Sequence, residues 1–268
     1  MKQLSSIVIL LLLCGCEQTM EDTVFPSFQE KLIVAADITV SSDSTIIGCN
    51  VSKTLPLNEP LDYQRSRVHD AEVRVVAGGV HYQMMPGSRA LMNIEANYSG
   101  TIPTPEDHVF SLEVRWHDKV MRGKINIPGL ELKFDTLATA INPFDSSVTD
   151  IFFRIKNDCA SSVYVLFQQF DSSRTVWEDA DDWFFEPTRF TPCSPMLNGF
   201  IRHHPYQSKQ LRYRITLVNM EYREYASKYR SSELFGTEGK NPKTNMTGDG
   251  LGFISYTIEG KPVTFFLK

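Results

Sequence analysis

The chain has 268 residues, of which 42% are hydrophobic and 22% are charged, and its formal net charge is −5. This composition is that of a globular protein, is too apolar for an intrinsically disordered chain, and gives no reason to expect nucleic acid as a partner. The aromatic content of 11%, mostly Phe and Tyr, favours strands over helices.

Residues 1–15 have the layout of a secretory signal peptide. Lys2 supplies a positive start, residues 7–13 form an unbroken apolar run, and small or polarisable residues follow. Seven apolar residues at a rise of ~1.5 Å each cover about a third of the ~30 Å hydrocarbon core of a bilayer. The run is therefore too short for a transmembrane helix, and no other apolar run approaches 18 residues.

Leu13-Cys14-Gly15-Cys16 resembles the bacterial lipobox, in which a large aliphatic residue stands three places before a lipidated cysteine. We expect cleavage after residue 15 and attachment of lipid to Cys16, which would anchor the body to a membrane essentially permanently. The alternative is an ordinary signal peptide with a chance cysteine near its cleavage site. Residues 16–25 are predicted to be a polar tether. Its three acids, at positions 17, 21 and 22, resemble surface-export signals of Bacteroidota lipoproteins, or else form a plain solvated linker.

Three further cysteines remain in the predicted mature chain, at positions 49, 159 and 193. An odd number in an oxidising compartment leaves two possibilities open. Cys159 and Cys193 pair and leave Cys49 buried and free, or all three are small buried hydrophobic residues. No C-x-x-C is present, so a structural zinc site is not expected.

The first half of the body shows the period-two alternation of antiparallel strands. Residues 71–75 alternate, and Gly78-Gly79 offers a two-residue hairpin turn into residues 80–82. Residues 110–116 and 120–127 alternate around a turn at residues 117–119, which predicts a hairpin with one solvated face. Residues 32–36 and 90–94 are further strand candidates. We expect residues 26–130 to form an N-terminal, immunoglobulin-like β-sandwich of about seven strands.

Residues 131–268 are predicted to form a C-terminal β-rich domain, joined to the first near residues 129–138. Strands are expected over residues 151–155, 163–170 and 211–217, and a last hairpin over residues 252–267 turns at Glu259-Gly260-Lys261. Tyrosines at helical spacing after Asn219, a suitable N-cap, predict one short helix over residues 220–232. The predicted fold class is mainly β, with two β-sandwich-like halves and one short helix in the C-terminal half.

Two polar clusters are candidates for binding chemistry. Residues 177–183 (Trp-Glu-Asp-Ala-Asp-Asp-Trp) offer four carboxylates and two tryptophans, which suit Ca²⁺ or a sugar ring, but they lack the spacing of a calcium loop. A solvated acidic loop is the favoured interpretation. His203-His204 is read as a surface turn, because adjacent residues on a strand point to opposite faces and converge poorly on one metal. The sequence therefore predicts no catalytic, cofactor-binding or metal-binding residues.

Several segments together resemble a family of Bacteroidota outer-membrane lipoproteins that carry a domain of unknown function (DUF4249). The segments are the lipobox, residues 28–35, the strand and tyrosine-rich stretch over residues 215–225, Asn241-Pro242, Asn245-Met246 and Gly248-Asp249-Gly250-Leu251-Gly252-Phe253. The glycines of the last segment are expected to permit a positive φ or close backbone approach ahead of the last hairpin, not to bind phosphate. The family has no established reaction, and its members often occur beside TonB-dependent transporters.

The resemblance implies a non-enzymatic accessory or ligand-binding lipoprotein of the outer membrane, possessing no cofactor and partnered with a TonB-dependent nutrient transporter. A surface hydrolase acting on glycan or peptide, and a structural or adhesive surface subunit, are the alternatives. Asp22-Thr23-Val24, Asp43-Ser44-Thr45 and Asp135-Thr136-Leu137 also resemble the O-glycosylation signal of these bacteria, although chance matches to so short a pattern are expected. Two of the three are expected in linkers, at the tether and at the domain junction.

Overall fold

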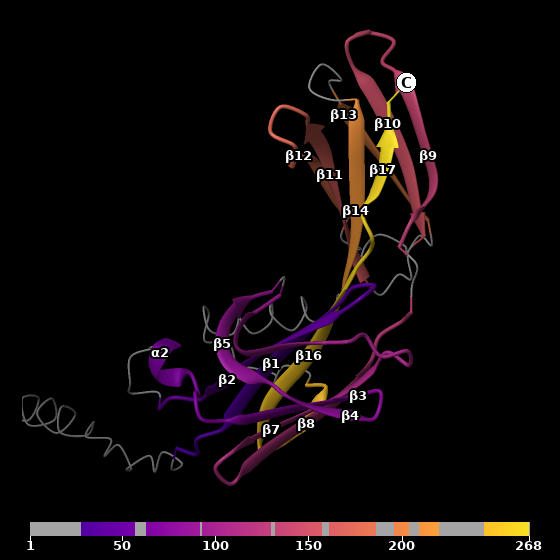
Figure 1. The fold of residues 1–268 in the computed structure, drawn as a ribbon. Helices are drawn as coiled ribbons and strands as arrows, with labels where there is room; N and C mark the ends of the chain where they lie inside the picture. Colours follow the sequence, from indigo (N-terminus) through magenta and orange to yellow (C-terminus); the bar gives the residue numbers. More distant parts are fainter. Residues whose placement is uncertain are drawn as a thin grey trace, which may run out of the picture.

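The structure is a computed structural model that describes residues 28–56, 63–91, 93–129, 132–156, 161–185, 196–203, 209–219 and 244–267. These residues form strands β1–β17 in three sheets, with the four-residue α2 (Tyr63–Ser66) as the one helix among them (Figure 1). The predicted mainly β class is confirmed. The predicted signal peptide, Cys16, the tether, Cys159, Cys193 and the helix over residues 220–232 lie outside the described residues.

Three sheets organise the chain. The large sheet has the order β12-β11-β14-β16-β1-β2-β6-β5, and β17 also pairs with β14. Its strands are β1 (Leu32–Val40), β2 (Thr45–Lys53), β5 (Met85–Ala90), β6 (Glu95–Ile102), β11 (Ser161–Asp171), β12 (Val176–Phe185), β14 (Gln210–Asn219), β16 (Gly250–Glu259) and β17 (Val263–Phe266). The five-stranded sheet has the order β15-β8-β7-β3-β4, from β3 (Glu72–Ala77), β4 (Val80–Gln83), β7 (Val109–Trp116), β8 (Lys119–Asn126) and β15 (Met246–Gly248). The three-stranded sheet has the order β13-β10-β9, from β9 (Phe134–Ile141), β10 (Thr149–Lys156) and β13 (Met196–His203).

Strand β1 joins the two ends of the chain. It pairs antiparallel with β2 and parallel with β16, over nine residue pairs on each side. Leu32, Val34, Ala36 and Ile38 alternate along β1 and are fully buried on the side of the core. Asp37 and Thr39 are buried as well, so the second half of β1 is covered on both faces. A strand from the predicted C-terminal domain thus lies in the same sheet as the first strand, and the domain division at residue 130 stays a prediction.

Both hairpins predicted in the first half are confirmed. β3 and β4 are joined by Gly78-Gly79, whose φ angles of 56° and 77° are those that glycine adopts readily in a two-residue hairpin turn. β7 and β8 are joined at His117-Asp118, and Trp116 lies opposite Lys119. The alternation of apolar and polar residues therefore sets the register of both hairpins.

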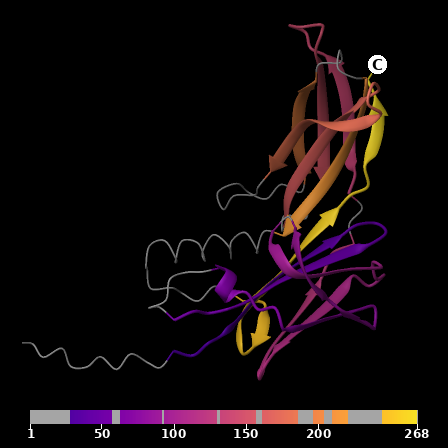
Figure 2. The same cartoon turned by 60° about the vertical axis from the view of Figure 1, so that its left-hand side comes forward.

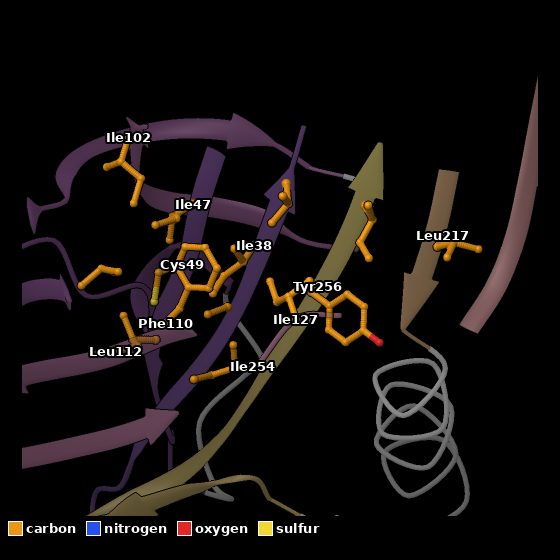
Figure 3. Close-up of a cluster of buried hydrophobic side chains, with 14 of the residues drawn as sticks. Ile38, Ile47, Cys49, Ile102, Phe110, Leu112, Ile127, Leu217, Ile254 and Tyr256 are labelled. Atoms are coloured by element: carbon orange, nitrogen blue, oxygen red, sulfur yellow. The ribbon is translucent and has the colours of Figure 1, made fainter. Parts of the chain in front are cut away.

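The large and five-stranded sheets share one hydrophobic core, part of which is shown in Figure 3. Ile38 and Cys49 reach it from β1 and β2, and Phe110 from β7. Strand β8 approaches β16 so closely that a Cβ added to Gly123 would stand 2.5 Å from Ile254 Cδ1. The inward faces of the two sheets are therefore in direct contact.

An aromatic cluster fills the other end of the molecule. The ring centroid of Phe134 in β9 lies 3.8 Å from Tyr213, 4.9 Å from Phe153 and 6.0 Å from Phe167. These residues come from the three-stranded sheet and from β11 and β14 of the large sheet. Figures 1 and 2 both show these strands gathered at one end and the five-stranded sheet at the other.

The predicted last hairpin is wrong. β17 does not return along β16; both pair antiparallel with β14, Leu217 lying opposite Ile258 and Leu211 opposite Phe265. The register shifts by only one residue between these pairs, and Gly260 N donates a 2.8 Å hydrogen bond to Ile215 O at the break. β16 and β17 therefore form one continuing strand with a bulge, because Glu259-Gly260-Lys261 supplies an extra residue and not a reversal.

The predicted strand over residues 90–94 is also wrong. β5 ends at Ala90, and the next residues connect it to β6, with Leu91 N bonded to Ile94 O at 2.9 Å. Leu91 is apolar because it covers the sheet at Gly48, where an added Cβ would lie 2.3 Å from Leu91 Cδ1. A short apolar run of this kind does not distinguish a strand from a connection that packs on a sheet.

Candidate functional site

A row of charged side chains crosses the outer face of the five-stranded sheet. Arg74 of β3 lies opposite Glu113 of β7, Glu113 lies opposite Arg122 of β8, and Arg122 lies opposite Thr247 of β15. Residues directly opposite each other in paired strands project from the same face. Leu112, which neighbours Glu113, is buried in the core, so the row faces away from the core.

This face is hollowed into a groove of about 740 Å³, which we call the cationic groove. Four of its lining residues are basic, namely Arg74, Arg115, Arg122 and Lys124, whereas Glu113 is its one acidic lining residue. His81, Ser111 and Thr247 add neutral polar groups. The groove thus concentrates positive charge on a chain that is acidic as a whole.

Glu113 fixes two of these guanidinium groups. Its Oε1 accepts a 2.6 Å hydrogen bond from Arg115 Nε, and its Oε2 accepts one of 2.6 Å from Arg122 Nε. The hydrogen bond from Arg115 lowers the pKa of Glu113 most, and the bond from Arg122 lowers it further. The carboxylate is therefore charged at neutral pH. Solvent-exposed ion pairs contribute little to stability. The arrangement is therefore better explained by orientation of the guanidinium groups than by stabilisation of the fold.

The described chain begins beside the hairpin that carries the groove. Glu30, just before β1, forms ion pairs with two lysines. Its Oε2 lies 2.9 Å from Lys53 Nζ, and its Oε1 lies 3.8 Å from Lys119 Nζ. Lys119 opens β8 and precedes Arg122 by three residues, which is about 10 Å along a strand. The start of the body and the cationic groove therefore share the β7–β8 hairpin.

The acidic segment over residues 177–183 is not the predicted loop. It lies in β12 and pairs with β11, Trp177 opposite Phe170 and Asp179 opposite Gln168. Arg212 of β14 stands 4.4 Å from the Trp177 ring centroid and donates a 2.7 Å hydrogen bond to Gln168 Oε1, and Gln168 Nε2 donates one of 2.8 Å to Asp179 Oδ1. The neighbouring strands thus supply partners that let an acidic, aromatic sequence form a strand.

The prediction of a surface turn at His203-His204 is wrong for His203. This residue ends β13 opposite Thr149 and is buried, whereas His204 lies outside the described residues. Across the described ranges, no group of three or more His, Cys, Asp or Glu side chains is arranged to hold a metal ion. Nor does any helix there have the length and apolar character to span a bilayer.

The glycine-rich motif is a crossover between two sheets. Gly248 ends β15 and Gly250 begins β16, so the chain passes from the five-stranded to the large sheet between them. Gly248 has a φ of 128°, and a Cβ there would lie 1.9 Å from Val120 O; a Cβ on Gly250 would lie 1.9 Å from Leu32 O. Asp249 Oδ2 accepts a 3.0 Å hydrogen bond from Val120 N. The expected close backbone approach is confirmed.

The structure tests two smaller predictions, of which one is confirmed and the other is partly wrong. Cys49 is free and fully buried, and burial raises the pKa of its thiol, as expected of a small hydrophobic residue. Thr136, one of the glycosylation candidates, lies exposed in β9 and not in the predicted linker, because β9 begins at Phe134. Ser44 lies in the turn between β1 and β2, and Thr23 lies outside the described residues.

Sequence reasoning does not find the cationic groove. The alternation around residues 117–119 predicts that Arg115, Arg122 and Lys124 face solvent, which is correct. It does not predict that β3 pairs with β7 and brings Arg74 into the same row. The available signal is Arg115 on one strand of the predicted hairpin and Arg122 and Lys124 at alternate positions on the other.

No protein-family model matches the chain, and no curated protein matches its sequence. Among solved structures, the chain is similar to a DUF3823 family protein from Bacteroides ovatus ATCC 8483, at 9% sequence identity and a TM-score of 0.23. The match covers 69% of this chain and 89% of that chain. This likeness is distant and carries no argument about function. The resemblance to DUF4249 lipoproteins accordingly stays a prediction from the sequence.

Proposed function

We propose that this chain is a lipid-anchored outer-membrane lipoprotein, exposed at the cell surface, whose body binds a ligand or partner without catalysing a reaction. The anchor is supported by Leu13-Cys14-Gly15-Cys16 and the preceding apolar run. The single observation that carries the binding role is the cationic groove, a concave face with four basic side chains beside the start of the body. Concave sites with converging polar groups are where proteins most often bind ligands.

The partner we propose is a TonB-dependent nutrient transporter, for which the lipoprotein is an accessory. The support is the resemblance to lipoproteins encoded beside such transporters. The twelve residue steps from Cys16 to Phe28 span at most about 40 Å, so an anchored body stays within reach of a membrane protein.

We also propose that the body consists of two sandwich-like halves, with β16 shared between them. The common core of the large and five-stranded sheets supports the first half. The aromatic cluster between the three-stranded sheet and β11 and β14 supports the second.

Metabolic labelling tests the anchor. Cells that express wild type, Cys16→Ala or Cys14→Ala are grown with a radioactive fatty acid, and the protein is followed by autoradiography and membrane sedimentation. Wild type and Cys14→Ala should be labelled and sediment with membranes, because Cys14 leaves with the signal peptide, whereas Cys16→Ala should be unlabelled. An unlabelled wild type, or a labelled Cys16→Ala, contradicts the anchor.

Affinity capture tests the accessory role. Tagged wild type is purified from detergent-solubilised outer membranes, and an unrelated lipoprotein with the same tag serves as the control. Mass spectrometry should show a TonB-dependent transporter enriched with this chain alone. Equal recovery of transporters by both baits contradicts the role.

A further inference from the structure

The cationic groove contains hydrogen-bond donors that the protein itself does not use. Arg115 and Arg122 donate Nε to Glu113, and no hydrogen bond from their terminal Nη atoms is found within the described part of the chain. Arg74 donates through Nη2 to Glu72, which leaves its other N–H groups to a ligand. Lys124 lies opposite Ser111 and lines the same groove, and it forms no ion pair with any described residue. Guanidinium groups match the planar geometry of carboxylates and bind them through two parallel hydrogen bonds. The groove therefore presents oriented donors suited to carboxylates.

The spacing of these cations requires more than one anionic group on the ligand. Arg74 and Arg122 lie on either side of β7, two strand spacings or about 10 Å apart at the backbone. Lys124 follows Arg122 by two residues, about 7 Å along β8. A single carboxylate cannot contact all three, so the matching ligand carries several along its length.

The rest of the groove favours a sugar chain over a peptide. Ser111, Thr247 and His81 place neutral hydrogen-bonding groups between the cations, which suits a ligand with many hydroxyl groups. The edge strands β4 and β15 line the groove only at its two ends, through His81 and Thr247, and addition of a peptide strand there is the outcome that the hexaglutamate comparison tests.

We infer that the cationic groove binds an acidic oligosaccharide, with carboxylates on Arg74, Arg122 and Lys124 and hydroxyl groups on Ser111 and Thr247. This inference rests on the proposed binding role of the body. Glu113 affects ligand binding in two ways: its carboxylate orients Arg115 and Arg122, and its charge repels the carboxylates of the ligand. Glutamine at this position keeps an oxygen that accepts from one Nε and loses the charge, so Glu113→Gln should bind more tightly.

Binding is measured by isothermal titration calorimetry on the purified full chain with hexagalacturonate as the probe. A neutral hexasaccharide, hexaglutamate and inorganic polyphosphate are the comparison ligands. The variants are Arg122→Gln and Glu113→Gln, and the matched control is Arg174→Gln, an exposed arginine in the β11–β12 turn that also pairs with carboxylates. Equal unfolding midpoints of all four proteins establish that they are folded.

Arg122→Gln should weaken hexagalacturonate binding about tenfold or more, Glu113→Gln should strengthen it severalfold, and Arg174→Gln should leave it unchanged. Equal affinity of Arg122→Gln and Arg174→Gln, or equal binding of the neutral hexasaccharide, overturns the inference. Tighter binding of hexaglutamate or polyphosphate than of hexagalacturonate also overturns it, in favour of a peptide or phosphate ligand. Labelling of Cys16 and transporter capture are read separately. A labelled, captured protein that ignores the sugar fails this inference alone, and an unlabelled protein that binds the sugar fails only the anchor.

Discussion

The hydroxyl oxygen of Ser255 lies 2.9 Å from Asp37 Oδ1, and both side chains are fully buried where β1 and β16 pair. The same hydroxyl lies 3.0 Å from Ala36 O, although it has one hydrogen to donate. The Ser255 hydroxyl hydrogen is therefore shared between Asp37 Oδ1 and Ala36 O, and Asp37 Oδ2 is buried with no hydrogen-bond partner among the described residues. Burial raises the pKa of Asp37, against the opposing effect of hydrogen bonds from Asn93 and Ser255. Burial and the Oδ2 atom without a partner thus both disfavour the charged form of Asp37 relative to a solvated carboxyl.

Asp37→Asn should flatten the pH dependence of stability. Because the folded-state pKa lies above the unfolded one, the folded chain keeps a proton that the unfolded chain has released. Stability is therefore fully present below the unfolded pKa of about 3.9 and falls as pH rises to the folded pKa, by up to about 1.4 kcal/mol per pH unit. Urea unfolding from about pH 4 to pH 8 should show this decline in wild type relative to Asp37→Asn. Asp43→Asn, in an exposed bend, is the control; parallel profiles for wild type and Asp37→Asn would refute the raised pKa of Asp37.

Gly250→Ala should destabilise the protein by about 1–3 kcal/mol, because its Cβ would overlap Leu32 O and force β1 and β16 apart. Gly87→Ala in β5 is the matched control, since no heavy atom lies within 4 Å of a Cβ there. Chemical denaturation measures both. A Gly250→Ala protein as stable as Gly87→Ala would mean that the crossover tolerates a side chain.

Phe134→Ala should cost about 3–5 kcal/mol of unfolding free energy, because it opens a cavity among Phe153, Phe167 and Tyr213. Phe144→Ala removes the same side chain from the β9–β10 turn, where Phe144 is 96% exposed, and should change stability by less than about 0.5 kcal/mol. Guanidinium titration distinguishes the two. Similar losses from both variants would count against the aromatic cluster as a core.

Cys49 should resist alkylation in the native protein, since it is fully buried and its thiol pKa is raised. A Cys159→Ala/Cys193→Ala variant leaves Cys49 as the reactive thiol expected in the mature, lipidated chain. Mass spectrometry after iodoacetamide treatment should detect modification in denaturant and none under native conditions. Rapid native labelling would show that β2 opens locally.

Local patterns in the sequence predict the hairpins well and the partners of each strand poorly. Gly78-Gly79 and the alternation around His117 fix β3–β4 and β7–β8, because turn chemistry and one buried face determine a hairpin locally. Nothing local indicates that Leu32 lies opposite Gly250, more than two hundred residues away. That pairing decides which core β1 enters, and it requires tertiary information.

The errors have similar causes. The charge of Asp179 favours a loop in the sequence. In the structure Gln168 of β11 donates a hydrogen bond to Asp179, and Arg212 of β14 donates one to Gln168. Gly260 suggests a reversal, but its N–H bonds to Ile215 of a third strand and the chain continues. The cationic groove is missed for the same reason, since Arg74 joins Arg122 only through the pairing of β3 with β7 and β7 with β8. Residue type indicates solvation, whereas the partners come from the fold.

The double pairing of β1 gives the molecule a mechanical property. A pull on the chain ahead of Leu32 runs along the axis of β1 and loads its hydrogen bonds to β2 and β16 together, in shear, so that they must rupture as a group. Since β16 continues into β17 along β14, the same tension passes into the far end of the large sheet. A body held at its N-terminus can thereby bear force without unravelling from its first strand.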